Sequence, residues 1–219
     1  MKGLLEPAIN GTTGILHAIK THAPQVKRVV VTSSLAAMVN SASEPKLYDE
    51  SSWNPITWDE ASTQRGLAYR GSKTFAERSA WAFIKRDRPN FDLVTMNPPL
   101  VYGPVVHWLD NLDHLNTSNQ RIRDLIQGKV RGPELPPTGT FLFTDVRDLA
   151  LAQVKSIEIF EAGGKRFFIT AGHYSNKEIV DVLRDTYPEL ASQLPPQPLT
   201  TFQMMSMGLT IPEPGKYWA

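Results

Sequence analysis

Hydrophobic residues recur at a helical period near the start of the chain. Between residues 4 and 21 they stand mostly three or four positions apart, at Leu4, Leu5, Ala8, Ile9, Ile15, Leu16 and Ile19. This spacing predicts an amphipathic helix over residues 4–21, because such positions share one face of a helix. The short and nearly continuous apolar run over residues 26–32 then predicts a parallel strand that is buried on both faces.

A polar segment separates this strand from the next periodic stretch. Residues 41–66 carry Trp53 and Trp58 among polar side chains, which predicts a long surface connection of the kind that often forms the wall of a site. Hydrophobic residues on one face predict a helix over 67–85, and the run at 92–96 predicts the next strand.

Helical and strand patterns continue to alternate in the second half of the chain. After an irregular stretch at 107–117, we predict helices over 118–126, 146–160 and 176–186 and strands over 140–143 and 166–170. Gly128 is placed to end the first of these helices, and Ser175 is placed to cap the last. Strands that alternate with helices indicate an α/β protein with a parallel sheet.

The candidate chemistry begins with a tyrosine and a lysine at the start of the helix predicted over 67–85. Tyr69 and Lys73 are four residues apart, so they share one face of that helix. A cation beside a phenol favours the phenolate and lowers the phenol pKa from its ordinary value of about 10. Such a phenol can exchange a proton with a carbonyl or an alcohol near neutral pH. The alternative is a surface pair without a catalytic role.

Two further segments lie on either side of this pair in the sequence. The run Val29–Val31 ends in Thr32, Ser33 and Ser34, and the run at 91–96 leads directly into Asn-Pro-Pro-Leu-Val-Tyr-Gly-Pro at 97–104. In this order the chain resembles the extended short-chain dehydrogenase/reductase family of the NAD-dependent epimerase/dehydratase superfamily. The similar branch holds the dihydroflavonol-reductase-like proteins and the fungal aldehyde and ketone reductases. Residues 7–12 and 143–148 extend the resemblance over nearly the whole chain.

The resemblance implies a fold and a division of the chain. The fold is part of a doubly wound, Rossmann-like parallel sheet, with a small substrate-side region toward the C-terminus. Residues 1–104 would form the partial core with the Ser-Tyr-Lys site. Residues 105–219 would hold the remaining sheet elements together with the substrate-binding region.

The resemblance also implies catalytic roles for four residues. Tyr69 would protonate the substrate oxygen as hydride arrives at the carbon, and Lys73 would lower the Tyr69 pKa. Ser34, the second serine of its pair, would hydrogen-bond the same oxygen. Asn10 would help to order a proton-relay water. The structural alternatives are a strand-end turn for Ser34 and an ordinary helix position for Asn10.

The cofactor implied by the resemblance is NADPH, and the substrate is a small-molecule carbonyl compound. The residues that would bind the cofactor are Thr32, Ser33, Tyr69, Lys73, Asn97, Pro98 and Val101. The residues that would contact the substrate are Leu35, Tyr102, His107 and Trp108. Structural alternatives are strand termination by Pro98 and simple loop exposure for His107. Asp145 and Arg147 are better explained as a helix cap and its partner.

The chain departs from the family at the usual dinucleotide-binding turn. Members begin with a strand, a Gly-x-x-Gly-x-x-Gly turn and a helix, and the turn holds the cofactor pyrophosphate. This sequence has no such motif, so two βαβ units of about 70–90 residues are absent. No closing helix follows residues 213–219. We therefore expect a fragment, a truncated gene product or a chain that does without the cofactor.

Composition narrows the kinds of binding partner and of site that the chain could have. A net charge of +1 over 219 residues gives no reason to expect nucleic acid or an anionic membrane as partner, and no apolar run is long enough to span a bilayer. The absence of cysteine excludes disulfides and thiolate metal sites, and it is compatible with a cytoplasmic protein, which we expect. His107, His114 and His173 lack metal-ligand spacing, so no metal site is predicted.

Three functions follow from these observations. The first is an NADPH-type carbonyl reductase, or a fragment of one, since a cofactor must carry the hydride. The second is a cofactor-independent isomerase, cyclase or dehydratase that reuses the Ser-Tyr-Lys pocket. The third is a non-catalytic homo-oligomer. In relatives that dimerise, the helices resembling 4–21 and 67–85 form a four-helix interface.

Overall fold

The computed structural model describes residues 2–40, 48–132 and 134–196. Within these residues the chain divides into two compact units. The first unit comprises residues 2–99 and 149–169, and the second comprises residues 100–148 and 170–196. Each unit carries a small sheet of its own.

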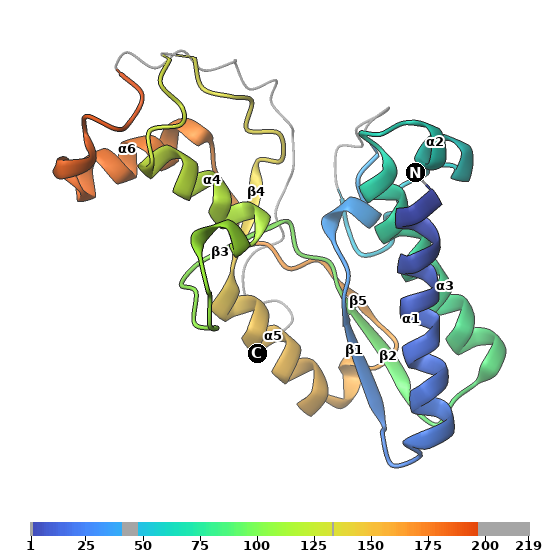
Figure 1. The fold of residues 1–219 in the computed structure, drawn as a ribbon. Helices are drawn as coiled ribbons and strands as arrows, with labels where there is room; N and C mark the ends of the chain where they lie inside the picture. Colours follow the sequence, from blue (N-terminus) through green and yellow to red (C-terminus); the bar gives the residue numbers. More distant parts are fainter. Residues whose placement is uncertain (1, 41–47, 133, 197–219) are drawn as a thin grey trace. The chain divides into compact units, whose positions relative to one another are not determined.

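The first unit is built on a three-stranded parallel sheet in the order β1-β2-β5 (Figure 1). The strands are β1 (Arg28–Thr32), β2 (Asp92–Met96) and β5 (Arg166–Phe167). Val30 of β1 lies opposite Val94 of β2, and Thr95 of β2 lies opposite Arg166 of β5. The predicted parallel α/β architecture is confirmed in this unit, although the strand predicted over 166–170 pairs only through its first two residues.

Two long helices pack beside each other along this sheet. They are α1 (Lys2–His22) and α3 (Ala68–Asp87), as predicted to within three residues at each end. Leu16 of α1, Phe83 of α3 and Leu93 of β2 meet in one buried cluster. Burying side chains of this size contributes about 1.5–3 kcal/mol each, which explains why Leu16 and Phe83 turn inward. Leu4 and Ile15, predicted on the same face of α1, are exposed instead.

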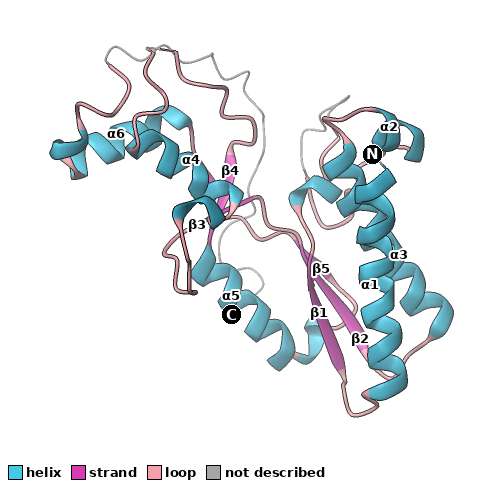
Figure 2. Cartoon of the chain, in the orientation of Figure 1, coloured by secondary structure: helices cyan, strands magenta, loops and turns pink. Residues whose placement is uncertain are grey.

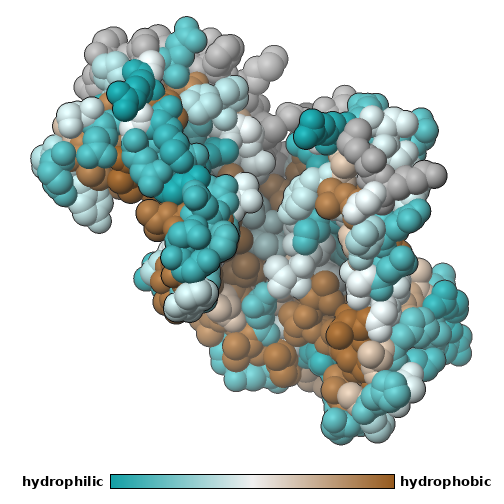
Figure 3. Space-filling view, viewed as in Figure 1, coloured by the Kyte–Doolittle hydropathy of each residue, from teal (hydrophilic) through white to brown (hydrophobic). Residues whose placement is uncertain are grey.

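The prediction that the strand at 26–32 is buried on both faces is wrong. Residues Arg28–Val31 are only half-buried and Thr32 is exposed, whereas Leu93–Met96 of β2 are buried. The reason is position: within the described residues β1 pairs with β2 alone and forms one edge of the sheet. Hydrophobic side chains are visible on the surface over β1 and over the C-terminal half of the neighbouring helix α5 (Figure 3).

The polar connection predicted over 41–66 contains a helix that the prediction missed. Residues 41–47 lie outside the described part, and α2 runs over Trp58–Thr63. Thr57 and Glu60 form a reciprocal capping box at its start, in which the Thr57 Oγ1 accepts from the Glu60 amide and the Thr57 amide donates to Glu60 Oε2. The Thr-x-x-Glu spacing was visible in the sequence, and it outweighs the polar composition.

The second unit holds a mixed sheet in the order β3-β4-β6. Its strands are β3 (Leu100–Tyr102), β4 (Leu142–Asp145) and β6 (Gly172–His173). The pair β3–β4 is parallel and the pair β4–β6 is antiparallel. The sequence reading missed β3 and β6, which have three and two residues, and placed β4 two residues early. Strands this short carry too few alternating positions to be detected.

Three further helices complete the described part of the chain (Figure 2). They are α4 (Thr117–Ile126), α5 (Val146–Glu158) and α6 (Asn176–Thr186), with short 3₁₀ turns at Leu35–Ala37, Leu112–His114, Phe160–Ala162 and Pro188–Leu190. The predicted cap of α6 is confirmed, since Ser175 Oγ accepts from the Glu178 amide. Leu125 of α4 and Val180 of α6 share a buried cluster.

The length and hydropathy of the helices show whether any of them could cross a membrane. Across the described ranges, no helix combines the length and the apolar character needed to cross a bilayer.

Candidate active site

The carboxyl ends of β1 and β2 come together in the first unit. The Ser33 amide donates to Met96 O at 2.7 Å, and the Leu35 amide donates to Pro98 O at 2.8 Å. The Asn97 side-chain Nδ2 also donates to Ser34 O at 3.2 Å. Ligands of open α/β sheets bind at such carboxyl ends. The structure thus brings together two segments that are 63 residues apart in the sequence.

Ser34 occupies a turn between β1 and the 3₁₀ helix that follows. Its backbone is extended and its Oγ accepts from the Ala36 amide at 3.1 Å, so it caps that helix. The hydroxyl hydrogen has no acceptor among the described residues, and the side chain is half-buried. Ser34 therefore keeps one free donor at the end of β1.

Tyr69 and Lys73 lie in the first two turns of α3. Tyr69 is 54% exposed, and Lys73 is half-buried. Neither the Tyr69 hydroxyl nor the Lys73 ammonium has a hydrogen-bond partner or ion pair within the described ranges. Both groups are therefore available to a bound molecule. Their predicted roles stay predictions.

Gly71 explains how α3 presents this pair. It is buried against Ala61 of α2 and Leu5 of α1, where a side chain would not fit. Residues two apart on a helix point in directions that differ by about 200°. The side of α3 that carries Tyr69 and Lys73 therefore points away from this three-helix contact.

The other predicted site residues of the first unit lie in varied surroundings. Thr32 is exposed, and its Oγ1 accepts from Gln153 Nε2 at 2.7 Å. Leu35 is buried in the 3₁₀ helix after β1. Asn10 is exposed on α1, and no side-chain hydrogen bond joins it to another described residue.

The remaining predicted residues belong to the second unit. Val101 and Tyr102 lie in β3, and the Tyr102 ring meets the Tyr174 ring edge-on at 5.3 Å. The Tyr102 hydroxyl is buried, and the described residues offer it no hydrogen-bond partner. His107 and Trp108 follow in an exposed segment, where Trp108 is 82% exposed.

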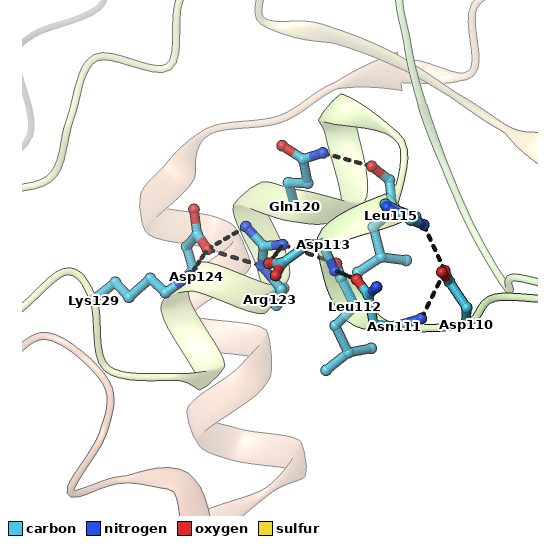
Figure 4. A network of polar contacts seen from close by, with 10 residues as sticks. Asp110, Asn111, Leu112, Asp113, Leu115, Gln120, Arg123, Asp124 and Lys129 are labelled. Atoms are coloured by element: carbon cyan, nitrogen blue, oxygen red, sulfur yellow. Dashed lines mark hydrogen bonds and ion pairs between the residues drawn. The ribbon is translucent and has the colours of Figure 1, made fainter.

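A polar network fixes the chain just after this exposed segment (Figure 4). Arg123 of α4 donates to Leu112 O at 2.8 Å and to Asp113 Oδ1 at 3.0 Å, while Gln120 donates to Leu115 O at 2.6 Å. Hydrogen bonds from Lys129 and then Arg123 lower the pKa of Asp124 below its usual range. Residues 112, 113 and 115 are thereby held to α4, although residues 111–114 remain exposed like much of the segment before them.

The predicted structural role of Asp145 and Arg147 is confirmed. Asp145 Oδ1 accepts from the Arg147 amide at 2.8 Å, and Asp145 Oδ2 accepts from Arg147 Nη2 at 2.7 Å. The Arg147 guanidinium and amide lower the pKa of Asp145 to about 2. Asp145 therefore caps the start of α5 directly after β4, and Arg147 is its ion-pair partner.

The chain is similar to fungal reductases over most of its own length. No family model matches the chain. It is 51% identical over 192 residues to the ketoreductase azaE of Aspergillus niger, with 88% of this chain and 56% of that protein covered. It is 43% identical over 197 residues to the putative NADPH-dependent methylglyoxal reductase GRP2 of Candida albicans, with 89% and 57% covered.

Solved structures of reductases are similar to the chain as well. The structure of Gre2 from Candida albicans in complex with NADPH matches with a TM-score of 0.81 and 35% identity, over 90% of this chain and 59% of that one. The chain is similar to the extended short-chain dehydrogenase/reductase superfamily over about nine tenths of its own length. It spans a little over half the length of the reductases to which it is similar.

The described residues could hold one end of such a cofactor. Tyr69 and Lys73, which have no partners in the described part, lie on α3, the helix whose Glu77 bonds to Ser33 and Asn97, and they are the residues that could hold the nicotinamide ribose. A pyrophosphate cradle is missing from the described part. The turn after β1 carries serines, and Gly11 and Gly14 lie inside α1.

One residue next to the predicted site was not predicted from the sequence. Glu77 of α3 is 2% exposed, and it accepts hydrogen bonds from Ser33 Oγ at 2.5 Å and Asn97 Nδ2 at 2.7 Å. It also forms an ion pair with Arg166 of β5 at 2.6 Å. Its four-residue spacing from Lys73 was a signal, but a glutamate on a helix is ordinarily exposed.

Proposed function

We propose that this chain is the carbonyl-activating part of an NADPH-dependent aldehyde or ketone reductase. The observation that carries the proposal is the pair Tyr69 and Lys73. Both are without partners in the described structure and lie one turn apart on α3, the helix whose Glu77 contacts the ends of β1 and β2. The similarity to fungal ketoreductases and methylglyoxal reductases supports it.

Ser34, Tyr69 and Lys73 then each act on the substrate carbonyl group. Ser34 donates its free hydroxyl hydrogen to that oxygen and orients it. Tyr69 gives its phenolic proton to the oxygen as the carbonyl becomes an alcohol, and the positive charge of Lys73 stabilises the phenolate that remains. Bound NADPH supplies the hydride that reaches the carbonyl carbon. The substrate class is a small aldehyde or ketone.

A cofactor-independent isomerase, cyclase or dehydratase is the second candidate. The observation in its favour is that the proton donor is kept in a sequence without a glycine-rich turn for pyrophosphate. Such an enzyme would use Tyr69 as acid and base without hydride. Turnover in the absence of NADPH separates the two candidates.

The test combines cofactor binding with turnover. Calorimetric titration with NADPH and loss of NADPH absorbance with methylglyoxal are measured for the wild-type chain and for Tyr69→Phe. We expect binding in both, and turnover about 10² to 10⁴-fold lower in Tyr69→Phe. Tyr187→Phe, at an exposed tyrosine after α6, is the matched control and keeps full turnover.

Two results would overturn the proposal. One is full turnover by Tyr69→Phe, which removes the proton donor from the mechanism. The other is a wild-type chain that neither binds NADPH nor reduces any aldehyde or ketone in a panel of small carbonyl compounds.

A further inference from the structure

Glu77 is a carboxylate in the interior of the first unit. It follows Lys73 by one turn of α3, and its side chain is 1% exposed. Five donors surround it. Oε2 accepts from Ser33 Oγ and Asn97 Nδ2, and Oε1 accepts from Arg166 Nε, Thr95 Oγ1 and Trp81 Nε1, at distances between 2.5 and 3.4 Å. A buried charge is costly unless it is paired and hydrogen-bonded, and here it is both.

The ion-pair partner of Glu77 is itself held on three sides. Arg166 Nη1 donates to Glu50 O and Ser52 O, each at 2.7 Å. Its guanidinium lies over the Trp53 ring, 3.7 Å from the centroid. Arg166 is in β5, so the pair joins α3 to β2 and β5, to Ser33 just after β1, and to the segment 50–53.

The carboxylate also decides how Asn97 is oriented. Asn97 Nδ2 donates to Glu77 Oε2 and to Ser34 O, while its Oδ1 is buried and finds no partner in the described part of the chain. A flipped amide would place Oδ1 against the Glu77 carboxylate and the Ser34 carbonyl, where acceptors would face acceptors. The negative charge of Glu77 therefore keeps the Asn97 donor on Ser34.

These contacts reach Ser34 from two directions. Ser33, which precedes it, donates its hydroxyl to Glu77, and Asn97 holds its carbonyl. The geometry points to Glu77 as a positioning residue that, with Arg166, fixes the backbone of Ser34 and so the direction in which the Ser34 hydroxyl meets the substrate oxygen. This inference rests on the proposed function for Ser34. Glu77 itself touches neither substrate nor cofactor.

Glu77→Gln is the first variant to test. It keeps the shape and turns one acceptor oxygen into an amide donor that faces other donors. Asp92→Asn is the matched control, because it makes the same change in the Arg28–Asp92 pair at the opposite ends of β1 and β2. If Glu77→Gln does not fold, the double variant Glu77→Gln, Arg166→Met removes both charges, a change that buried pairs often tolerate.

The first readout is amide hydrogen exchange, which does not depend on turnover. We expect the Leu35 and Ser33 amides, which bond to β2 and its extension, to exchange about tenfold faster or more in the Glu77 variant than in wild type. The buried core around Phe83 should change little, and Asp92→Asn should leave Leu35 unchanged. Uniform acceleration of all amides, or none at Leu35, would show a purely structural pair and overturn the inference.

The second readout is a double-mutant cycle with Ser34→Ala. If Glu77 acts through Ser34, Glu77→Gln lowers kcat about tenfold to a hundredfold alone and adds little to Ser34→Ala. Additive losses would contradict the inference. If the chain shows no turnover at all, the proposed function fails for this chain, and hydrogen exchange still decides whether Glu77 holds the Ser34 segment.

Discussion

Gly71 of α3 and Ala61 of α2 meet with no room for another atom between them. A Cβ added to Gly71 would overlap the Ala61 Cβ and would lie 3.3 Å from Leu5 Cδ2. Three helices are thus packed around one missing side chain, on the side of α3 opposite to Tyr69 and Lys73.

Gly71→Ala should therefore destabilise the first unit. Overpacking of a close contact costs about 1–3 kcal/mol, and urea unfolding measures it. Gly14→Ala, in the middle of α1 with open space around it, is the control and should stabilise by about 0.5–1 kcal/mol, because alanine suits a helix interior better. Equal stability of Gly71→Ala and wild type would show that α2 is not packed against α3 as described.

Ser34→Ala should weaken catalysis more than stability. The Ser34 hydroxyl caps a 3₁₀ turn through a single bond to Ala36, so its loss costs about 0.5–1.5 kcal/mol of unfolding free energy. Turnover should fall further, because the carbonyl oxygen loses a donor. Thermal unfolding and kcat/KM are compared with those of Ser175→Ala, which removes the cap of α6 and should lower stability by about 0.5–2 kcal/mol while turnover holds. The reverse pattern for Ser34 would support the turn interpretation.

The contribution of Asp145 to stability should be lost in acid. Arg147 lowers its pKa in the folded state to about 2 from an ordinary value of 3.8. The contribution is therefore complete above about pH 4, and it is lost as the pH falls through about 2. In Arg147→Met the Asp145 pKa, followed by the NMR shift of its carboxyl carbon, should rise toward the ordinary value.

The Arg147 backbone amide still donates in that variant, so the rise should be incomplete. Lys155→Met removes a cation further along α5 and should leave the Asp145 pKa where it is. An unchanged Asp145 pKa in Arg147→Met would contradict the described pair.

The 219-residue chain by itself should associate or be poorly soluble. Within the described residues β1 forms an open edge, and α5 exposes Leu151, Val154 and Ile157 at three-residue spacing beside it. Unpaired edges and exposed apolar faces favour association. Light scattering during size exclusion should show oligomers or aggregates, and Val154→Lys should raise the monomer fraction.

Val182→Lys is the control for this surface. Val182 is similarly exposed on α6 in the other unit, so the substitution adds the same charge elsewhere. A wild-type chain that elutes as a monomer at high concentration would refute the prediction, and an equal effect of the two lysines would show that charge alone is responsible.

The sequence pattern was sufficient to predict those elements whose conformation depends on residues a few positions away. The helices α1, α3, α4 and α6 follow from the spacing of hydrophobic residues, and the Ser175 cap follows from a side chain and an amide three residues apart. The capping box of α2 was equally local and was overlooked. Strands of two or three residues carry no comparable signal, because their pairing partners are remote in the sequence.

The order of motifs along the chain also placed Ser34, Tyr69, Lys73 and Asn97 in one candidate site. The hydrogen bond between Asn97 and Ser34 is consistent with that grouping, since parallel pairing of β1 and β2 aligns their carboxyl ends. Leu35 is buried in the structure, which the sequence did not indicate.

By itself, then, the sequence determined which segments become helices and which side chains could exchange a proton with a carbonyl. Only the tertiary structure decided that Glu77 is buried, because its partner Arg166 is 89 residues away and no local pattern joins the two. The same holds for the open edge of β1, since an apolar strand is covered or left open according to its neighbours in the sheet. Hydrophobic spacing acts over one or two turns, whereas the burial of a charge or a strand depends on contacts that form only when distant segments fold together.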